Sequence, residues 1–319
     1  MKKICKAVGK GLLGLLILIA LFLIVMAVYN QIMLRKNKDL YETPLGQLVE
    51  VDGHNMSIYT EGAGEHTVVF LSGHGTASPI LDFKPLYSRL SGDYKIVVVE
   101  KFGYGFSDLV DGKRDIDTIL RQDREALGKC GIEAPYVLCA HSFSGYEATR
   151  WAQEYPDEVE AIVGLDMCTP HCMDVSQLKE AGAGFVLAEG FARFMKAVGI
   201  IRLFDYNESG TLTEEESAIY KEIACHKNVN ATMRNEADME SLIALNDERN
   251  AAPLPTVPMI LYVSNEPSND AFWVGGMQAM ADASSDGTLI RLDCGHYVHY
   301  YAYERISRDM KMLIEKPDS

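Results

Sequence analysis

Short apolar runs alternate with helical patterns through the first half of the chain. Four runs predict buried strands, at 67–71, 95–100, 136–140 and 161–165. Helical patterns follow the first three runs, near 84–91, 116–130 and 145–155. This alternation predicts a mostly parallel sheet with helices on both faces. Ahead of it, residues 47–51 and 55–60 alternate in polarity around Asp52-Gly53, a turn signal that predicts two antiparallel strands.

The strand pattern stops at Thr169-Pro170 and resumes only at 259–263, with a last run at 289–292. Helical patterns fill the interval, near 175–179, 190–198, 213–224 and 235–244. We therefore expect a helical unit at 170–255, inserted between the sixth and seventh strands. The core domain then consists of residues 45–169 together with 256–316.

The N-terminal segment has a different pattern, because residues 11–29 contain neither a charge nor a proline. A run of this length can cross the hydrocarbon core of a bilayer as a helix. Four lysines precede the run, which favours an N-terminus inside the cell and the remainder of the chain outside. Residues 1–35 are therefore predicted to be a single-pass anchor in the cell membrane. A cleaved signal peptide is the alternative, with Val25-Met26-Ala27 as the cleavage site.

Composition and charge limit which partners the chain can bind and which disulfide or metal sites it can form. The chain has 319 residues and a net charge of −15, and no long basic run follows its N-terminus. Nucleic acid is therefore not an expected partner. The seven cysteines form neither a disulfide framework nor a zinc-binding spacing, and whether Cys168 and Cys172 pair is open.

The strongest chemical signal lies around Ser142. An apolar run ends at Ala140-His141, Ser142 follows, and a helical pattern begins within three residues. This strand–turn–helix context is typical of a nucleophile elbow, in which a serine stands exposed at a helix N-terminus. Small residues, Ala140 and Ser144, stand two positions to either side, where glycines are usual. A serine that only caps the helix is the simpler alternative.

Three further motifs occur in a fixed order around this elbow. They are the small-residue loop Ser72-Gly73-His74, the segment Gly103–Asp108 after the 95–100 strand, and the pair Gly295-His296 after the last strand. With the elbow, they make the chain resemble the α/β-hydrolase family over roughly residues 45–315. The resemblance implies the α/β-hydrolase fold, with 170–255 as its helical cap. Ser72 departs from the family pattern, which more often has histidine there.

The resemblance also implies roles for individual residues. Ser142 is the expected nucleophile and His296 the expected base. The expected oxyanion hole consists of the backbone N–H groups of Phe143 and His74. Haloalkane dehalogenases and epoxide hydrolases are disfavoured, because they use an aspartate where this chain has Ser142.

The acid that should orient His296 is ambiguous. The family commonly places it after the strand that corresponds to 259–263, but Pro267 occupies the expected position. Some members of the family carry the acid one strand earlier, at a site that matches Asp166 at the end of the preceding strand. A carboxylate there is costly unless it has a partner, so Asp166 either orients His296 or caps local backbone amides. Asp166 is our first choice as the acid. Asp270 is second and Glu266 third.

A pattern in the expected cap suggests a metal site. Asp205, Asn207, Ser209 and Glu216 have the spacing of ligands in an EF-hand calcium loop. The same residues also suit a plain helix start, in which Thr213 and Glu216 form a capping box. No second loop of this kind is present, and we favour the capping box, so no metal or other cofactor is expected.

Together these features predict a membrane-anchored serine hydrolase that cleaves a carboxylic ester through an acyl-serine intermediate. Its expected partners are a small ester or peptide substrate and the lipid bilayer, which residues 11–29 contact. An aminopeptidase of the proline iminopeptidase type is an alternative, and Glu180, Glu189 or Glu236 could then hold the substrate amine. A third possibility, from a different class, is a hydrolase-fold binding module that has lost catalysis.

Overall fold

The computed structural model describes residues 2–170, 172, 175–236, 252–266 and 271–316, and within them an eight-stranded sheet forms the core. The strand order is β1-β2-β4-β3-β5-β6-β7-β8. The strands are β1 Gln47–Val51, β2 His54–Glu61, β3 Thr67–Leu71, β4 Lys95–Glu100, β5 Tyr136–His141, β6 Val159–Leu165, β7 Met259–Val263 and β8 Gly287–Arg291. β2 pairs antiparallel with β1 and β4, and the other pairs are parallel. The predicted sheet, with its antiparallel start, is confirmed.

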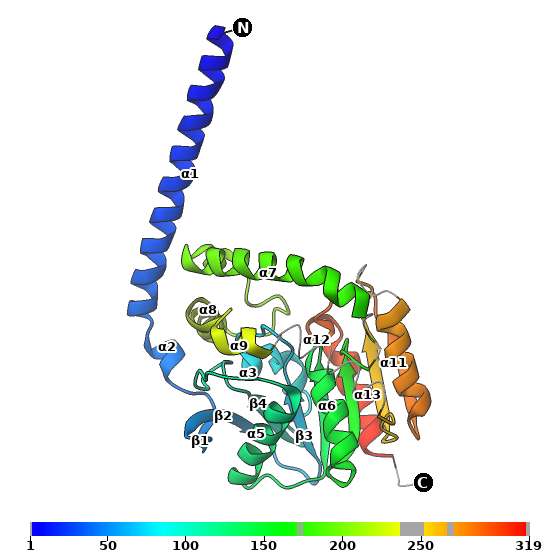
Figure 1. Ribbon diagram of the computed structural model, residues 1–319. Coiled ribbons are helices and arrows are strands. Elements are labelled where there is room, and N and C mark those ends of the chain that lie inside the picture. The colour runs from blue at the N-terminus through cyan, green and yellow to red at the C-terminus, as the bar shows by residue number, and fades with distance from the viewer. Residues whose placement is uncertain (1, 171, 173–174, 237–251, 267–270, 317–319) are drawn as a thin grey trace.

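Helices cover both faces of the sheet (Figure 1). One face packs against α3 Pro79–Asp82, α4 Lys84–Tyr87 and α13 Tyr303–Ile314. The other packs against α5 Ile116–Lys129, α6 Ser144–Glu154 and α11 Ala271–Ala283. Neighbouring strand residues alternate between the two apolar cores, as Val68 and Val69 do, because strand side chains point to opposite faces. Both faces are thus buried, which explains the continuous apolar runs of the parallel strands.

The helix predicted near 84–91 is different in the structure. The chain there forms two four-residue helices, α3 and α4, and each has a proline in its first turn, Pro79 and Pro85 respectively. Proline is tolerated at a helix start but not in its interior, so Pro85 begins a new helix rather than continuing α3.

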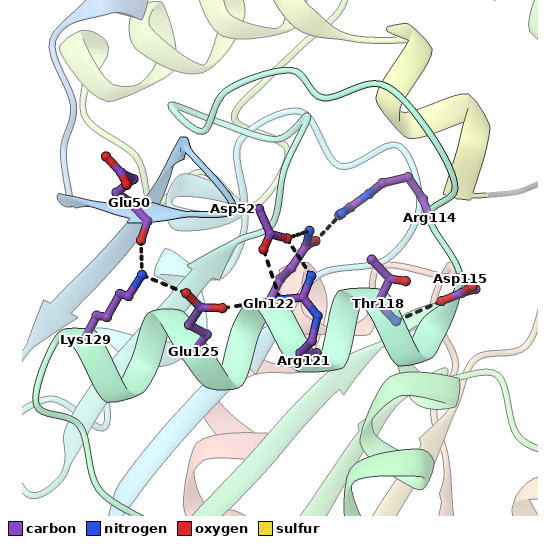
Figure 2. A network of polar contacts seen from close by, with 9 residues as sticks. All are labelled: Glu50, Asp52, Arg114, Asp115, Thr118, Arg121, Gln122, Glu125 and Lys129. Carbon is purple, nitrogen blue, oxygen red and sulfur yellow. Dashed lines mark hydrogen bonds and ion pairs between the residues drawn. The ribbon is translucent and has the colours of Figure 1, made fainter.

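A polar network fixes α5 to the hairpin that precedes it, as Figure 2 shows. Asp52 lies in the turn between β1 and β2 with a positive φ of 50°, and Gly53 follows with 76°. The Asp52 carboxylate accepts hydrogen bonds from Arg121 at 2.5 Å and from Gln122 at 2.7 Å. Gln122 in turn accepts a hydrogen bond from the buried Arg114. The hairpin turn predicted at Asp52-Gly53 is therefore confirmed, and it also orients a helix.

The insertion between β6 and β7 is helical, as predicted. It contains α7 Val175–Ala197, the short 3-10 helix η2 Ile200–Leu203, α8 Glu214–Lys227 and α9 Ala231–Glu236. The two helices expected at 175–179 and 190–198 are in fact the single helix α7. Gly184 and Gly190 lie within it, because a glycine costs a helix only about 1 kcal/mol and does not interrupt its hydrogen bonds. The predicted helix 235–244 lies mostly outside the described residues.

The N-terminal segment is one long helix, α1 Lys2–Lys36, which projects away from the body (Figure 1). Its segment Val8–Lys36 contains an 18-residue window with a mean hydropathy of 3.1. The segment is long and apolar enough to cross a membrane, as a signal sequence can also be. A second short helix, α2 Asp39–Glu42, leads into β1. The last two short elements are η1 Pro156–Glu158 and α12 Val298–Tyr301.

Candidate active site

Ser142 occupies a strained turn between β5 and α6. Its φ is +52°, a left-handed conformation that is uncommon for residues other than glycine. The turn is held from both sides, because the Ser142 N–H donates to the Leu165 carbonyl at 3.2 Å and the Ser142 carbonyl accepts from the Cys168 N–H at 2.7 Å. Strain of this kind persists only where the surrounding structure over-determines it. Here that structure is the parallel pair of β5 and β6.

The neighbours of Ser142 are small because other chain segments approach the turn closely. A Cβ atom at Gly145 would lie 2.1 Å from the Cys168 carbonyl oxygen, and one at Gly73 would lie 2.8 Å from the Ser142 Cβ. Ser144 replaces the usual glycine, and its buried hydroxyl donates to the carbonyl of Leu71 at 2.6 Å or to that of His141 at 2.9 Å. The elbow thus accommodates a serine at this position because its hydroxyl has partners.

Ser142, His296 and Asp166 lie in one hydrogen-bonded line. His296 Nε2 is 2.8 Å from Ser142 Oγ, and His296 Nδ1 is 2.7 Å from Asp166 Oδ2. The three residues follow β5, β8 and β6 respectively. Carboxyl ends of parallel strands meet at one edge of a sheet, which is why residues 130 or more positions apart come together here.

Asp166 is fully buried and has several donors. Its carboxylate accepts from the Ser264 N–H at 3.1 Å, the Ser264 hydroxyl at 2.7 Å and the Trp273 indole N–H at 3.0 Å, besides its contact with His296. Burial alone would raise the pKa of Asp166, but the hydrogen bonds from His296, Ser264 and Trp273 outweigh it and lower that pKa. The carboxylate is therefore ionised beside the imidazole.

Of the two other candidate acids, Glu266 lies within the described residues and does not contact the His296 ring in the same way. Glu266 accepts a hydrogen bond from the backbone N–H of His296 at 3.2 Å, so it holds the main chain of that residue rather than its ring. Asp270 lies outside the described residues. Of the described candidates, Asp166 is the carboxylate that contacts the His296 ring.

The two residues expected to form the oxyanion hole flank Ser142. His74 lies in the loop after β3, where Gly75 has a φ of +82°, and its ring lies edge-on to that of Phe143 at 6.3 Å. Phe143 follows Ser142, and among the described residues its N–H donates to no backbone or side-chain acceptor. Gly73 brings this loop against the Ser142 side chain. The arrangement leaves the Phe143 N–H available to a substrate oxygen.

His141 packs beside the site without joining it. Its ring lies 4.8 Å from the ring of His296, and its Nε2 is 3.3 Å from the His296 carbonyl oxygen. Burial, together with the nearby imidazoles of His299 and His296, lowers the pKa of His141 well below its ordinary value. A neutral His141 supports the position of His296 and adds no positive charge to the site.

A buried ion pair supports the loop that carries His74. Lys101, which follows β4, contacts Glu236 at the end of α9, and both side chains are at most 3% exposed. Glu236 also accepts a hydrogen bond from Tyr104 and lies 3.4 Å from His74 Nδ1. Burial alone would raise the pKa of Glu236, but the charge of Lys101 and the contact with His74 lower it to about 2. Glu236 therefore joins the helical insertion to the loop beside Ser142.

A second pair of acids lies buried near this cluster. Asp123 of α5 and Glu147 of α6 form a carboxyl pair, and both are about 1% exposed. Burial raises the pKa of both groups, and the negative charge of Asp123 raises that of Glu147 further. One of the two must carry a proton for a hydrogen bond to join them. The two acids lie on α5 and on α6, the helix that starts at the elbow, and these two helices pack against each other.

Breaking the Lys101–Glu236 pair should strongly destabilise the fold. In Lys101→Met the Glu236 carboxylate stays buried without its cation, which costs about 3–5 kcal/mol. The double variant Lys101→Met/Glu236→Gln should recover most of that loss, because no charge remains unpaired. Thermal melting of the purified chain in detergent measures both. Equal melting temperatures for the two variants would contradict a specific pair.

Sequence reasoning missed most of the groups that surround the three central residues. Ser264 follows β7, and Lys101 follows β4. A polar residue directly after a buried strand was the signal that could have pointed to both. Trp273 and Tyr104 carry no such signal, because their roles depend on long-range contacts.

The calcium-like loop is organised as a helix start. Thr213 Oγ1 accepts from the Glu216 N–H at 3.2 Å, and the Glu216 carboxylate accepts from the Thr213 N–H at 3.0 Å, which confirms the predicted capping box. Glu216 also pairs with Lys84. Asp205 accepts from the Asn207 N–H, and the Ser209 hydroxyl lies 3.0 Å from that of Thr211. Glu216 would have to leave both the cap and Lys84 before it could bind a cation.

The two cysteines whose pairing was open are both free thiols, and both are buried. Cys172 Sγ lies 3.1 Å from the Tyr146 hydroxyl. Within the described residues, no group of three or more His, Cys, Asp and Glu side chains is arranged to hold a metal ion.

Comparisons with known proteins show the family to which this fold belongs. A model of the alpha/beta hydrolase family matches residues 68–308. The chain is 38% identical over 240 residues to the uncharacterized protein YbdG of Bacillus subtilis, covering 73% of this chain and 72% of that one. It is also 31% identical over 112 residues to a pimeloyl-[acyl-carrier protein] methyl ester esterase of Shewanella woodyi, covering 34% of this chain and 39% of the esterase.

Among solved structures, an epoxide hydrolase variant from Vigna radiata superposes with a TM-score of 0.67. It is 17% identical and covers 85% of this chain and 98% of its own. At that identity the likeness shows the fold alone. Because the family model reaches from β3 into α13, across the whole sheet after its first hairpin, the chain belongs to the alpha/beta hydrolase family.

Proposed function

We propose that this hydrolase cleaves a carboxylic ester through an acyl-Ser142 intermediate. The observation that carries the proposal is the line from Ser142 Oγ through His296 to Asp166, with contacts of 2.8 Å and 2.7 Å. A serine needs a base to take its proton, and the base needs an acid to orient it. An aspartate nucleophile, as epoxide hydrolases and haloalkane dehalogenases use, has no counterpart at this elbow.

The steps follow from the positions of these groups. His296 Nε2 accepts the Ser142 hydroxyl proton while Oγ attacks the ester carbonyl carbon, and the Asp166 carboxylate stabilises the imidazolium. The N–H groups of Phe143 and His74 stabilise the negative oxygen of the tetrahedral intermediate. His296 then gives its proton to the departing alcohol, which leaves the acyl-enzyme. A water molecule, deprotonated by His296, attacks the acyl carbon, and Ser142 regains its proton as the acid leaves.

The charges around the site favour an ester over the amino end of a peptide. An aminopeptidase would need a carboxylate free to bind the substrate's ammonium group. Glu236 already faces Lys101, and Glu189 lies 3.4 Å from Arg234. The side chain of Glu180 lies outside the described residues. The described candidate carboxylates thus have cationic partners of their own.

We expect kcat/KM for p-nitrophenyl butyrate to exceed that for prolyl-p-nitroanilide by about 100-fold or more. A buried ammonium group without a partner costs about 3 kcal/mol or more, which corresponds to that factor. The assay uses the purified full chain in detergent. Faster turnover of the anilide would favour the aminopeptidase instead. Turnover of neither substrate, by a chain shown to be folded, would favour the binding module.

We also propose that α1 anchors the enzyme in the cell membrane, with the catalytic domain on the outer side. Asn30 is 2% exposed, and its side chain accepts a hydrogen bond from Arg202 at 2.6 Å. Arg202 in turn pairs with Glu222 of α8. Cleavage after Ala27 would cut within the helix, one turn before this contact. The contact therefore supports an uncleaved anchor over a signal peptide.

A further inference from the structure

Helix α7 presents an apolar stripe to solvent. Leu187, Phe191 and Phe194 are 76%, 62% and 46% exposed, and their spacing of four and three residues places them on one face of the helix. Glu189 lies partly buried toward α9, where it contacts Arg234. Side chains as exposed as these are not part of a core.

The stripe continues into the next element. The 3-10 helix η2 follows α7 directly and contacts it, and Leu203 and Phe204 at its end are 64% and 51% exposed. Large apolar side chains that are exposed singly need no explanation, but a contiguous group marks an interaction surface. We name the five residues Leu187, Phe191, Phe194, Leu203 and Phe204 the apolar face.

The segment that joins α7 to η2 packs against α1, close to the apolar face. A Cβ atom at Gly199, between α7 and η2, would lie 2.6 Å from the Asn30 Cβ and 2.9 Å from the Met26 carbonyl oxygen. Arg202 of η2 donates to Asn30, and Asn37 donates to Glu222 of α8 at 2.7 Å. The insertion and the lower part of α1 are therefore one packed unit.

The length of α1 indicates where the outer boundary of the membrane lies relative to this unit. A bilayer core about 30 Å thick requires about 20 helical residues at 1.5 Å each. Counted from Gly11, directly after Lys10, this span ends at Asn30. Gly199 packs against Met26 and Asn30, so the end of α7 lies at the outer boundary of the hydrocarbon core. Figure 1 shows α7 running crosswise to α1, on the side of the body from which α1 projects.

We propose that the apolar face is seated in the surface of the bilayer that α1 crosses. A helix that lies in the membrane plane inserts an apolar face between headgroups and acyl chains, and this orientation matches α7. Arg193, exposed between Phe191 and Phe194, can extend its guanidinium to lipid phosphates. The proposal rests on α1 being a membrane anchor, not on the chemistry of Ser142.

The same placement defines a substrate class. Only residues 167–174 separate Asp166 from the first residue of α7. The helix on the membrane surface thus begins close to the carboxyl edge of the sheet, where Ser142 and His296 lie. Substrates would then be long-chain esters dissolved in the bilayer, which reach Ser142 without crossing bulk water.

Quenching by brominated lipid tests the placement directly. The full chain, carrying Phe191→Trp, is reconstituted in phosphatidylcholine vesicles with or without bromine on the upper acyl carbons. Met312→Trp is the matched control, because Met312 is also exposed, at 56%, in the last turn of α13. Figure 1 shows α13 in the body, away from α1 and α7. The native Trp151 and Trp273 give the background, measured on the unsubstituted chain.

We expect bromine to quench the tryptophan at 191 at least twofold more than the one at 312. Equal quenching of both would overturn the proposal. Quenching at 191 that vanishes as protein is diluted into lipid would also overturn it, because a second copy would then cover the face. None of these outcomes depends on catalysis, so a failure of the ester chemistry would be seen separately.

A second variant tests the substrate class. Phe191→Asp/Phe194→Asp should lower kcat/KM for a long-chain ester presented in vesicles by about tenfold or more, and leave that for soluble p-nitrophenyl acetate unchanged. Met312→Asp should change neither. Equal loss on both substrates, at an unchanged melting temperature, would contradict delivery from the membrane. A lowered melting temperature would place these side chains in the packing of the protein, which would also contradict it.

Discussion

Ser142→Ala is expected to abolish labelling by a fluorophosphonate probe and to lower ester turnover by about 10⁶-fold. Loss of the nucleophile of another serine hydrolase has an effect of this size, because what remains comes only from the oxyanion hole and from binding. In this chain the hydroxyl lies 2.8 Å from His296 Nε2, so its replacement removes both the attacking atom and the proton that His296 would take. Labelling is measured by gel fluorescence, and turnover is measured with p-nitrophenyl butyrate as the substrate.

Ser144→Ala is the matched control. Ser144 is a buried serine two positions away whose hydroxyl bonds only to backbone carbonyls, those of Leu71 and His141. Loss of this neutral hydrogen bond should cost about 1 kcal/mol of stability. Labelling should stay intact, because neither the attacking serine nor its base is changed. Equal labelling of Ser142→Ala and the unsubstituted chain would show that another residue is the nucleophile.

Asp166→Asn is expected to lower turnover by about 10⁴-fold, as the corresponding change does in another triad. The asparagine amide can donate to His296 Nδ1, which then holds the imidazole in the tautomer that cannot accept the serine proton. The effect should fall on kcat, because Asp166 is fully buried and acts through His296. The measurement is kcat and KM for p-nitrophenyl butyrate.

Glu266→Gln and Asp270→Asn serve as controls and should each cost less than about tenfold, by contrast with that loss. The Glu266 carboxylate accepts from the backbone N–H of His296 at 3.2 Å, and glutamine can still accept that bond. A crippling effect of Asp270→Asn, with near-normal turnover in Asp166→Asn, would reverse the assignment. Melting temperatures must be measured alongside, because Asp166 also accepts hydrogen bonds from Ser264 and Trp273.

The local pattern of the sequence was enough to predict the sheet. β3, β4 and β7 have the bounds that their apolar runs indicated, since a strand buried on both faces needs an unbroken apolar run. Ser142 and His296 were predictable for a related reason. Ser142 directly follows such a strand, and His296 lies in the loop after the last strand, and small residues beside both are visible in the sequence.

The helical insertion was predictable in kind but not in detail. Its position between β6 and β7 followed from the missing strand pattern. The continuity of α7 and the exposure of Phe191 and Phe194 did not, because an apolar stripe reads the same in a sequence whether it faces a core, a substrate or a membrane. Only the tertiary structure shows that these side chains are exposed rather than packed in a core.

The sequence by itself thus determined the strands, their order of appearance, and the positions of Ser142 after β5 and His296 in the loop after β8. Only the tertiary structure decided which carboxylate lies beside His296 and that Lys101 neutralises Glu236. The reason is physical. Strands and tight turns are specified by neighbouring residues, whereas a buried charge is stable only with a partner that another part of the chain supplies. Asp166 and His296 are 130 positions apart, and the fold alone brings them to 2.7 Å.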